Sequence, residues 1–160
     1  MKKVKVLLGD PRHNTRGLHS SMVPINIGYI GEFLKARIKE VDIELKLATD
    51  PEEILVLLQN WQPNVIGISN YVWNSALSNF ICTYANKINT DTLCILGGPE
   101  FPAGTGAIKI ENTSKDKTYD KCLDYLIERK SVDYFAYSDG EVVFVEILKK
   151  FIENNYSPKK

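Results

Sequence analysis

The apolar residues of this chain change spacing repeatedly, from short runs to positions three or four residues apart. Most of the short runs are rich in β-branched residues and end in small or polar residues, a pattern typical of buried parallel strands. They predict five strands, over Val4–Leu8, Ile43–Leu47, Val65–Ser69, Leu93–Leu96 and Val132–Tyr137.

Helical spacing follows each predicted strand. The apolar positions predict helices over Ile27–Ile38, Ile54–Trp61, Leu77–Ile88, Tyr119–Ile127 and Phe144–Ile152. The first helix begins near Pro24, because proline is favoured at a first helical position. Asp50 and Glu53 form a capping box around Pro51 at the start of the second helix. Residues 102–118 contain two glycines and a charged run, and predict a long loop.

Five consecutive strand–helix units predict a parallel sheet with helices on both faces. We therefore expect an α/β fold: a three-layer, Rossmann-like (flavodoxin-like), doubly wound sheet of five parallel strands. Residues 1–155 are expected to form one domain, and residues 156–160 a tail or the start of a linker. In such a sheet, ligands bind in the crevice beyond the carboxyl ends of the strands. The residues that follow the strands are therefore the candidates for function.

The third predicted strand ends in hydrogen-bonding and aromatic residues. Ser69 and Asn70 could bond a ligand there; alternatively, together with Asn74, they cap the following helix. Tyr71 and Trp73 lie in the same connection, where aromatic rings either cover the core or stack on a ligand.

Glycines follow the fourth and fifth predicted strands. Gly97 and Gly98 permit positive φ and close approach of the backbone to a bulky ligand, and a tight turn before Pro99 is a compatible explanation. The segment 138–141, Ser-Asp-Gly-Glu, contains an S-x-x-E capping box for the last helix. That box accounts for its serine and glutamate, and leaves Gly140 available for close approach.

The charge balance of the chain gives no support for a polyanionic partner. The 160 residues include 20 Lys and Arg and 20 Asp and Glu, so no excess of positive charge favours nucleic acid or an anionic membrane. No apolar run approaches the ~20 residues that a membrane span needs. The N-terminus also lacks the apolar stretch of a signal peptide. We therefore expect a cytoplasmic location, with neither a nucleic-acid nor a membrane partner.

Metal-binding and redox motifs are weak in this chain. Cys82, Cys94 and Cys122 are far apart and form no C-x-x-C pair, so buried, reduced thiols are expected. The long polar loop after the first strand holds both histidines, His13 and His19. Loops of this length at a strand's carboxyl end are often functional, but isolated histidines on polar loops are more often solvated than ligating.

The phosphate-binding motifs of other doubly wound proteins are missing. The first strand is followed by Gly-Asp-Pro-Arg-His-Asn at 9–14 rather than by G-x-G-x-x-G, and G-x-x-x-x-G-K-[ST] is absent. Ser69-Asn70 and Ser138 stand where a phosphoacceptor receiver needs an aspartate and a lysine. The hydroxyl residues of the first loop lack the compact arrangement that a flavodoxin uses for phosphate.

Four segments, in order along nearly the whole chain, carry a family resemblance. They are Pro24–Ile30, Ile66–Asn74, Leu96–Glu100 and Asp139–Glu141. Together they resemble the cobalamin (B12)-binding domain that precedes the catalytic domain in many radical S-adenosylmethionine enzymes. The resemblance implies that residues 1–155 are a cobalamin-binding domain. A corrinoid would lie at the sheet's carboxyl edge, with its dimethylbenzimidazole tail in the crevice.

The resemblance also implies which residues bind the cofactor. Those expected beside the ring or the tail are Ser69, Asn70, Tyr71, Trp73, Asn74, Gly97, Gly98, Pro99, Glu100, Gly140 and Glu141. Corrinoid carriers that ligate cobalt from below use D-x-H-x-x-G, whereas this chain has Asp10-x-x-His13. We therefore expect base-off binding without a histidine ligand. His13 is only a weak candidate for a cobalt ligand.

The C-x-x-x-C-x-x-C motif that holds the iron–sulfur cluster of such enzymes is absent from the chain. We therefore expect no catalysis by this chain alone. Its role would be to present the corrinoid to a radical S-adenosylmethionine catalytic domain, in cis or in trans. That domain would hold the 4Fe-4S cluster and S-adenosylmethionine, for methyl transfer or another radical reaction. Two alternatives remain: a cofactor-free interaction or regulatory domain of the same fold, and a flavin carrier.

Overall fold

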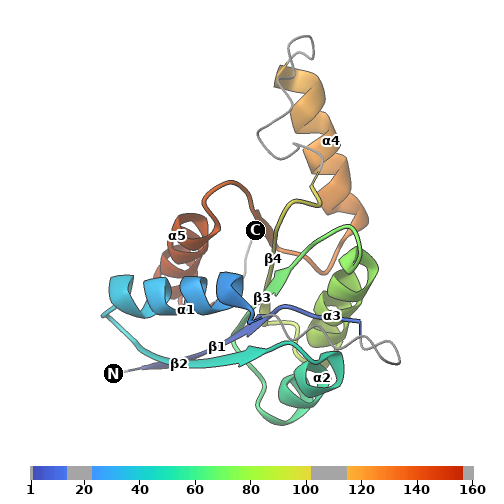
Figure 1. Ribbon diagram of the computed structural model, residues 1–160. Helices are drawn as coiled ribbons and strands as arrows, with labels where there is room; N and C mark the ends of the chain where they lie inside the picture. Colours follow the sequence, from blue (N-terminus) through green and yellow to red (C-terminus); the bar gives the residue numbers. More distant parts are fainter. Residues whose placement is uncertain (1, 14–22, 102–114, 157–160) are drawn as a thin grey trace.

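The chain alternates strands and helices as predicted (Figure 1). The computed structural model describes residues 2–13, 23–101 and 115–156. Its strands are β1 (Lys3–Gly9), β2 (Asp42–Ala48), β3 (Val65–Ser69), β4 (Leu93–Gly97) and β5 (Tyr134–Ala136). Its helices are α1 (Ile25–Arg37), α2 (Pro51–Asn60), α3 (Ser75–Ile88), α4 (Lys115–Glu128) and α5 (Gly140–Glu153).

The five strands form one parallel sheet in the order β2-β1-β3-β4-β5. This is the flavodoxin-like, doubly wound order, so the predicted fold class is confirmed. The register pairs Gly9 with Ile68, Ser69 with Gly97, and Gly97 with Ala136. The carboxyl ends of four strands therefore lie along the same edge, and the chain reverses direction across the sheet between β1 and β3.

Two apolar clusters cover the two faces of the sheet. One contains buried residues of α1 and α5, including Leu34 and Leu148, and the other contains residues of α2 and α3, including Ile54 and Ile81. The two helix pairs lie on opposite sides of the strands (Figure 1). Because helices cover β3 on both faces, its five residues are all buried, which explains its unbroken apolar run.

Helix α4 departs from the prediction. Residues 115–118 were expected in a loop, but they form the first turn of α4. A charged run in the sequence does not exclude a helix, because surface helices commonly carry charged residues. Figure 1 shows α4 projecting beyond the carboxyl edge of the sheet, with only its last turns near the body of the domain. The rest of the predicted loop, residues 102–114, lies outside the described residues.

The helix starts test the capping predictions. At α2, Asp50 Oδ1 accepts from the backbone N–H groups of Glu52 (2.7 Å) and Glu53 (3.2 Å), so the Asp50 half of the predicted capping box is confirmed. At α5 the predicted capping box is wrong. The N-cap is Asp139, no side chain caps the helix, and Ser138 adopts φ of 71°. The turn after β5 therefore places the serine one residue too early to cap.

Smaller differences concern an edge strand and a cysteine. β5 covers Tyr134–Ala136 rather than the predicted 132–137, and Val132 instead packs in the core before the strand begins. Cys82 and Cys94 are buried as expected, whereas Cys122 is only half-buried because α4 projects from the domain. Within the part of the chain that the structure describes, no helix is long and apolar enough to cross a bilayer.

Candidate functional site

A cavity of about 730 Å³ opens at the carboxyl edge of the sheet. It is bounded by α1, α5 and the ends of β1, β3, β4 and β5. Its apolar floor is formed by Leu8, Ile30, Gly67, Ile95 and Phe144. The volume lies within the range of roughly 300–1,000 Å³ typical of cofactor and small-molecule sites.

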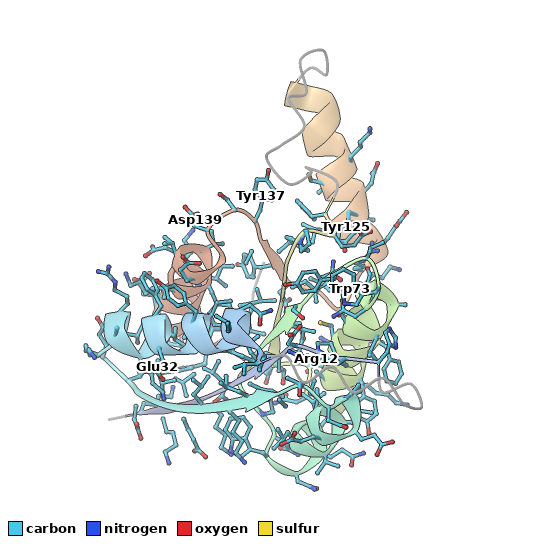
Figure 2. All side chains as sticks on the ribbon, in the orientation of Figure 1. Arg12, Glu32, Trp73, Tyr125, Tyr137 and Asp139 are labelled. Atoms are coloured by element: carbon cyan, nitrogen blue, oxygen red, sulfur yellow. The ribbon has the colours of Figure 1, made fainter. Side chains whose placement is uncertain are left out.

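The rim of this cavity is polar and aromatic, and its charged side chains are acidic. Asn26 and Tyr29 come from α1, Ser69 and Tyr71 from the end of β3, and Tyr137 from the end of β5. Asp139 and Glu141 are the charged residues among the described lining residues. In Figure 2, Tyr137 and Asp139 lie on the connection from β5 to α5, at the edge of the sheet from which α4 also projects.

The structure brings seven of the eleven predicted site residues to the cavity wall. These are Ser69, Tyr71, Gly97, Gly98, Pro99, Gly140 and Glu141. The other four, Asn70, Trp73, Asn74 and Glu100, lie beside the wall without lining it.

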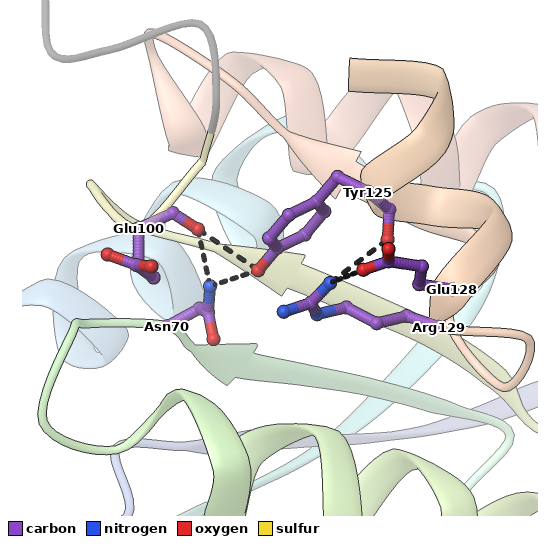
Figure 3. A network of polar contacts seen from close by, with 5 residues as sticks. All are labelled: Asn70, Glu100, Tyr125, Glu128 and Arg129. Carbon is purple, nitrogen blue, oxygen red and sulfur yellow. Dashed lines mark hydrogen bonds and ion pairs between the residues drawn. The ribbon is translucent and has the colours of Figure 1, made fainter. Parts of the chain in front are cut away.

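Asn70 is fully buried and bonds to the segment that forms the cavity wall after β4 (Figure 3). Its backbone N–H donates to the Gly97 carbonyl (2.7 Å), and its carbonyl accepts from the Glu100 N–H (3.2 Å). Its Nδ2 donates to the Glu100 carbonyl (2.7 Å) and to the Tyr125 hydroxyl (2.8 Å). Asn70 therefore positions residues 97–101, and couples them to α4.

Gly98 has the positive φ that the sequence predicted, at 139°. A Cβ at this position would lie 2.4 Å from the Asn70 carbonyl oxygen, much closer than atoms can pack. The close approach that requires glycine here is therefore to the backbone of Asn70, the residue directly after β3. Gly140 differs, since a Cβ there would meet only Ile30 Cδ1, at 4.0 Å. The space beside Gly140 belongs to the cavity.

The connection from β3 to α3 is held by Asn74. This residue is buried at the N-cap of α3, but its side chain makes no cap bond to that helix. Instead Oδ1 accepts from the Tyr71 N–H (2.7 Å) and Nδ2 donates to the Pro11 carbonyl (3.1 Å). Within this connection Tyr71 and Trp73 form a stacked pair, with ring centroids 4.6 Å apart and planes 9° apart. Trp73 is 64% exposed, so it does not cover the core.

His13 lies away from the cavity. Its Nε2 is 2.6 Å from the Trp73 carbonyl oxygen, and its ring borders a separate shallow groove beside Asp50 and Leu77. Across the described residues, no three His, Cys, Asp or Glu side chains gather closely enough to hold a metal ion. His19 lies outside the described residues.

Sequence reasoning did not name two aromatic residues of the wall, Phe101 and Tyr137. Phe101 stacks on Phe135, with centroids 4.1 Å apart, and its ring centroid lies 5.9 Å from that of Tyr137. Tyr137 directly follows β5, although the sequence predicted it inside that strand, and Phe101 lies four residues after β4. The first turn of α1 also lines the cavity, although Pro24–Ile30 contributed only to the resemblance.

The fold matches that of a solved protein. The 1.5 Å crystal structure of a novel cobalamin-binding protein from Desulfitobacterium hafniense DCB-2 aligns with a TM-score of 0.57 over 92% of this chain, at 12% sequence identity. This likeness shows the fold. The chain spans 58% of the length of that protein. No family model and no curated protein matches the chain.

Proposed function

We propose that this chain binds a cobalamin-type corrinoid in the cavity between α1 and α5. The observation that carries the proposal is the cavity itself. It lies at the carboxyl edge of a doubly wound sheet, where such folds bind ligands, and it has an apolar floor and a polar rim whose described lining residues include no basic side chain. A cobalamin-binding protein with the same fold supports the same assignment.

The residues present fit the chemistry of such a ligand. The apolar floor suits an uncharged aromatic base, and the hydroxyl and amide groups of Asn26, Ser69, Tyr71 and Tyr137 suit a ring fringed with neutral amides. The open space beside Gly140 admits a bulky group. A corrinoid carries a single phosphodiester, so its site needs no cluster of basic side chains.

The dipole of α1 is compatible with that phosphodiester. α1 and α5 both begin at the wall, and neither has a side chain bonded to its first turn. The N-terminus of the 13-residue α1 carries partial positive charge that favours an anionic group, and its first turn has no acidic residue, whereas Asp139 and Glu141 at the start of α5 would repel an anion. When bound, the corrinoid would supply a cobalt centre for group transfer. This chain's residues would bind and orient it.

We further propose base-off binding without a histidine ligand to cobalt. His13 is the one histidine among the described residues, it does not line the cavity, and its Nε2 already contacts the Trp73 carbonyl. The seven lining residues that the sequence predicted would contact the cofactor directly. Asn70, Asn74 and Glu100 would hold the wall in place, and Trp73 would lie at its outer margin.

The last part of the proposal concerns the reaction in which the bound corrinoid takes part. On the resemblance of the four sequence segments, the chain would present its corrinoid to a radical S-adenosylmethionine domain, in cis or in trans. The 4Fe-4S cluster and S-adenosylmethionine would belong to that domain. We propose that the complex works in the cytoplasm on a substrate read by the partner domain.

Anaerobic titration with hydroxocobalamin tests the binding function. The purified chain should shift the corrin absorbance with a 1:1 endpoint and retain the cofactor through gel filtration. The same titration with flavin mononucleotide serves as the control, because flavodoxin-like folds also bind flavin at this edge. An unshifted corrin spectrum with retained flavin would replace the proposal by a flavin carrier. No retention of either would leave a cofactor-free interaction domain.

A further inference from the structure

Ser69 stands at the cavity wall with its hydroxyl proton already engaged. Its Oγ donates to Asp10 Oδ1 over 2.5 Å, and the other carboxylate oxygen of Asp10 lies 3.4 Å from Arg12 Nη2. The side chains of Asp10 and Arg12 are 13% and 19% exposed, so this ion pair is largely shielded from water. The three residues join the ends of β1 and β3 at the point where the sheet changes winding direction.

The surroundings hold Ser69 in this orientation. The Ser69 carbonyl accepts from the hydroxyl of Ser78 in α3 (2.8 Å). The Asp10 N–H donates to the Ala48 carbonyl (3.0 Å), which ties the carboxylate to the end of β2. Both partners of the hydroxyl–carboxylate bond are therefore anchored through their backbones. Rotating the hydroxyl away would leave a shielded carboxylate oxygen without its donor.

A serine hydroxyl has one proton and two lone pairs, whereas an ionised carboxylate only accepts. With the proton given to Asp10, Ser69 Oγ can offer only lone pairs to a ligand in the cavity. We infer that Asp10 fixes Ser69 as a hydrogen-bond acceptor, so that the ligand group meeting Ser69 is an N–H or O–H donor. Asp10 is thus a positioning residue. Ser69 favours ligand groups that donate a hydrogen bond over groups that can only accept one.

Together with the proposed function, on which this step rests, the inference locates part of the ligand. The amide side chains of a corrin ring carry N–H donors, whereas the free ring nitrogen of a base-off benzimidazole is an acceptor. Ser69 would therefore contact a ring amide and would not bond that base nitrogen. The aromatic base is left to the apolar floor of the cavity, around Gly67 and Phe144.

The first arm of the test needs no ligand. Urea unfolding of the unaltered chain, Ser69→Ala, Asp10→Ala and the double variant gives a double-mutant cycle for the hydroxyl–carboxylate bond. Ser69→Ala should raise the unfolding equilibrium constant by a factor at least about fivefold larger in the unaltered chain than in the Asp10→Ala background. Equal effects in the two backgrounds would overturn the inference, because Ser69 would then be free to donate.

The second arm compares hydroxocobalamin with aquocobinamide, which keeps the ring amides and lacks the base. Ser69→Ala should weaken the binding of both corrinoids by a similar factor, about fivefold. Ser69→Thr should keep the affinity of the unaltered chain, because threonine retains the hydroxyl. A loss confined to hydroxocobalamin would overturn the inference, since Ser69 would then serve the base. If neither corrinoid binds the unaltered chain while the cycle shows coupling, the proposed function fails, and Ser69 stands as an acceptor for another donor ligand.

Discussion

Asn70 Nδ2 donates to the Tyr125 hydroxyl over 2.8 Å, and this bond joins the end of β3 to α4 across 55 positions of sequence. Tyr125 in turn donates to the Glu100 carbonyl (3.1 Å), which also accepts from Asn70. The three groups form a closed set of bonds behind the cavity wall (Figure 3). Residues 98–101 are thereby held by β3 on one side and by α4 on the other.

Removing the Tyr125 hydroxyl should loosen that wall. In Tyr125→Phe the ring keeps its edge contacts with Phe101 and Phe135, but Asn70 loses one buried acceptor. We expect the free energy of unfolding in urea to fall by about 1–1.5 kcal/mol. Tyr134→Phe, at an exposed ring on β5, is the matched control and should change stability by less than about 0.5 kcal/mol. Equal effects of the two variants would contradict the role given to Tyr125.

Gly98→Ala should destabilise the fold strongly, although it adds a single methyl group. The new Cβ would lie 2.4 Å from the Asn70 carbonyl oxygen, at a φ of 139° that side chains rarely adopt. A loss of at least about 2 kcal/mol is expected, measured as a lower urea midpoint. The control is Gly28→Ala in α1, where a Cβ meets no atom within 4 Å, and helix propensity should raise stability by about 0.5–1 kcal/mol.

Local patterns were sufficient to predict much of this fold. The run Val65–Ser69 became β3 with the same bounds, because a strand buried on both faces has no alternative to a continuous apolar sequence. Gly98 has the positive φ that the glycine pair permits, but the close approach there is to the Asn70 backbone and not to a ligand. The order of strand–helix units was enough for the doubly wound class, since right-handed crossovers restrict the topology.

The parts that sequence missed depend on contacts between distant segments. From its place after a strand, Asn70 was predicted to bind a ligand. Its side chain instead bonds to Tyr125 of α4 and supports the cavity wall, a contact that depends on a distant segment. The Ser138–Glu141 pattern satisfies a capping box, yet the turn leaving β5 gives Ser138 a φ of 71° and moves the N-cap to Asp139. Phe101 acquires its role from Phe135, more than thirty positions away.

The buried cysteines give a prediction about pH. A hydrogen bond shared with Cys82, followed by burial, raises the pKa of the Cys94 thiol above its ordinary value of 9.0. Above pH 9 the thiol of the unfolded chain loses its proton, whereas the buried thiol of the folded chain keeps it. The stability that the buried thiol contributes is therefore complete below pH 9, and the free energy of unfolding should decline between about pH 9 and 10.5. Replacing Cys94 with Ala should flatten that decline, and an unchanged slope would contradict the assignment.

His13→Ala should leave the spectrum of bound corrinoid unchanged. The imidazole lies beside the Trp73 carbonyl and outside the cavity, so its loss removes no cobalt ligand. The visible absorbance of the hydroxocobalamin complex checks this, with the free corrinoid at acid pH as the base-off reference. A shift of the bands in the variant would indicate histidine ligation, and base-off binding without histidine would be wrong.

The central claim is that a corrinoid occupies the cavity beside α5, and a variant that fills the cavity tests it most directly. Gly140→Leu should extend into the cavity, since a Cβ there meets only Ile30 Cδ1 at 4.0 Å, whereas Gly28→Leu adds the same side chain to α1 outside the cavity. In anaerobic titrations with hydroxocobalamin, we expect the unaltered chain and Gly28→Leu to bind equally. Gly140→Leu should bind at least about tenfold more weakly, a difference of about 1.4 kcal/mol. Equal binding by Gly140→Leu, or an unshifted corrin spectrum with the unaltered chain, would contradict the account.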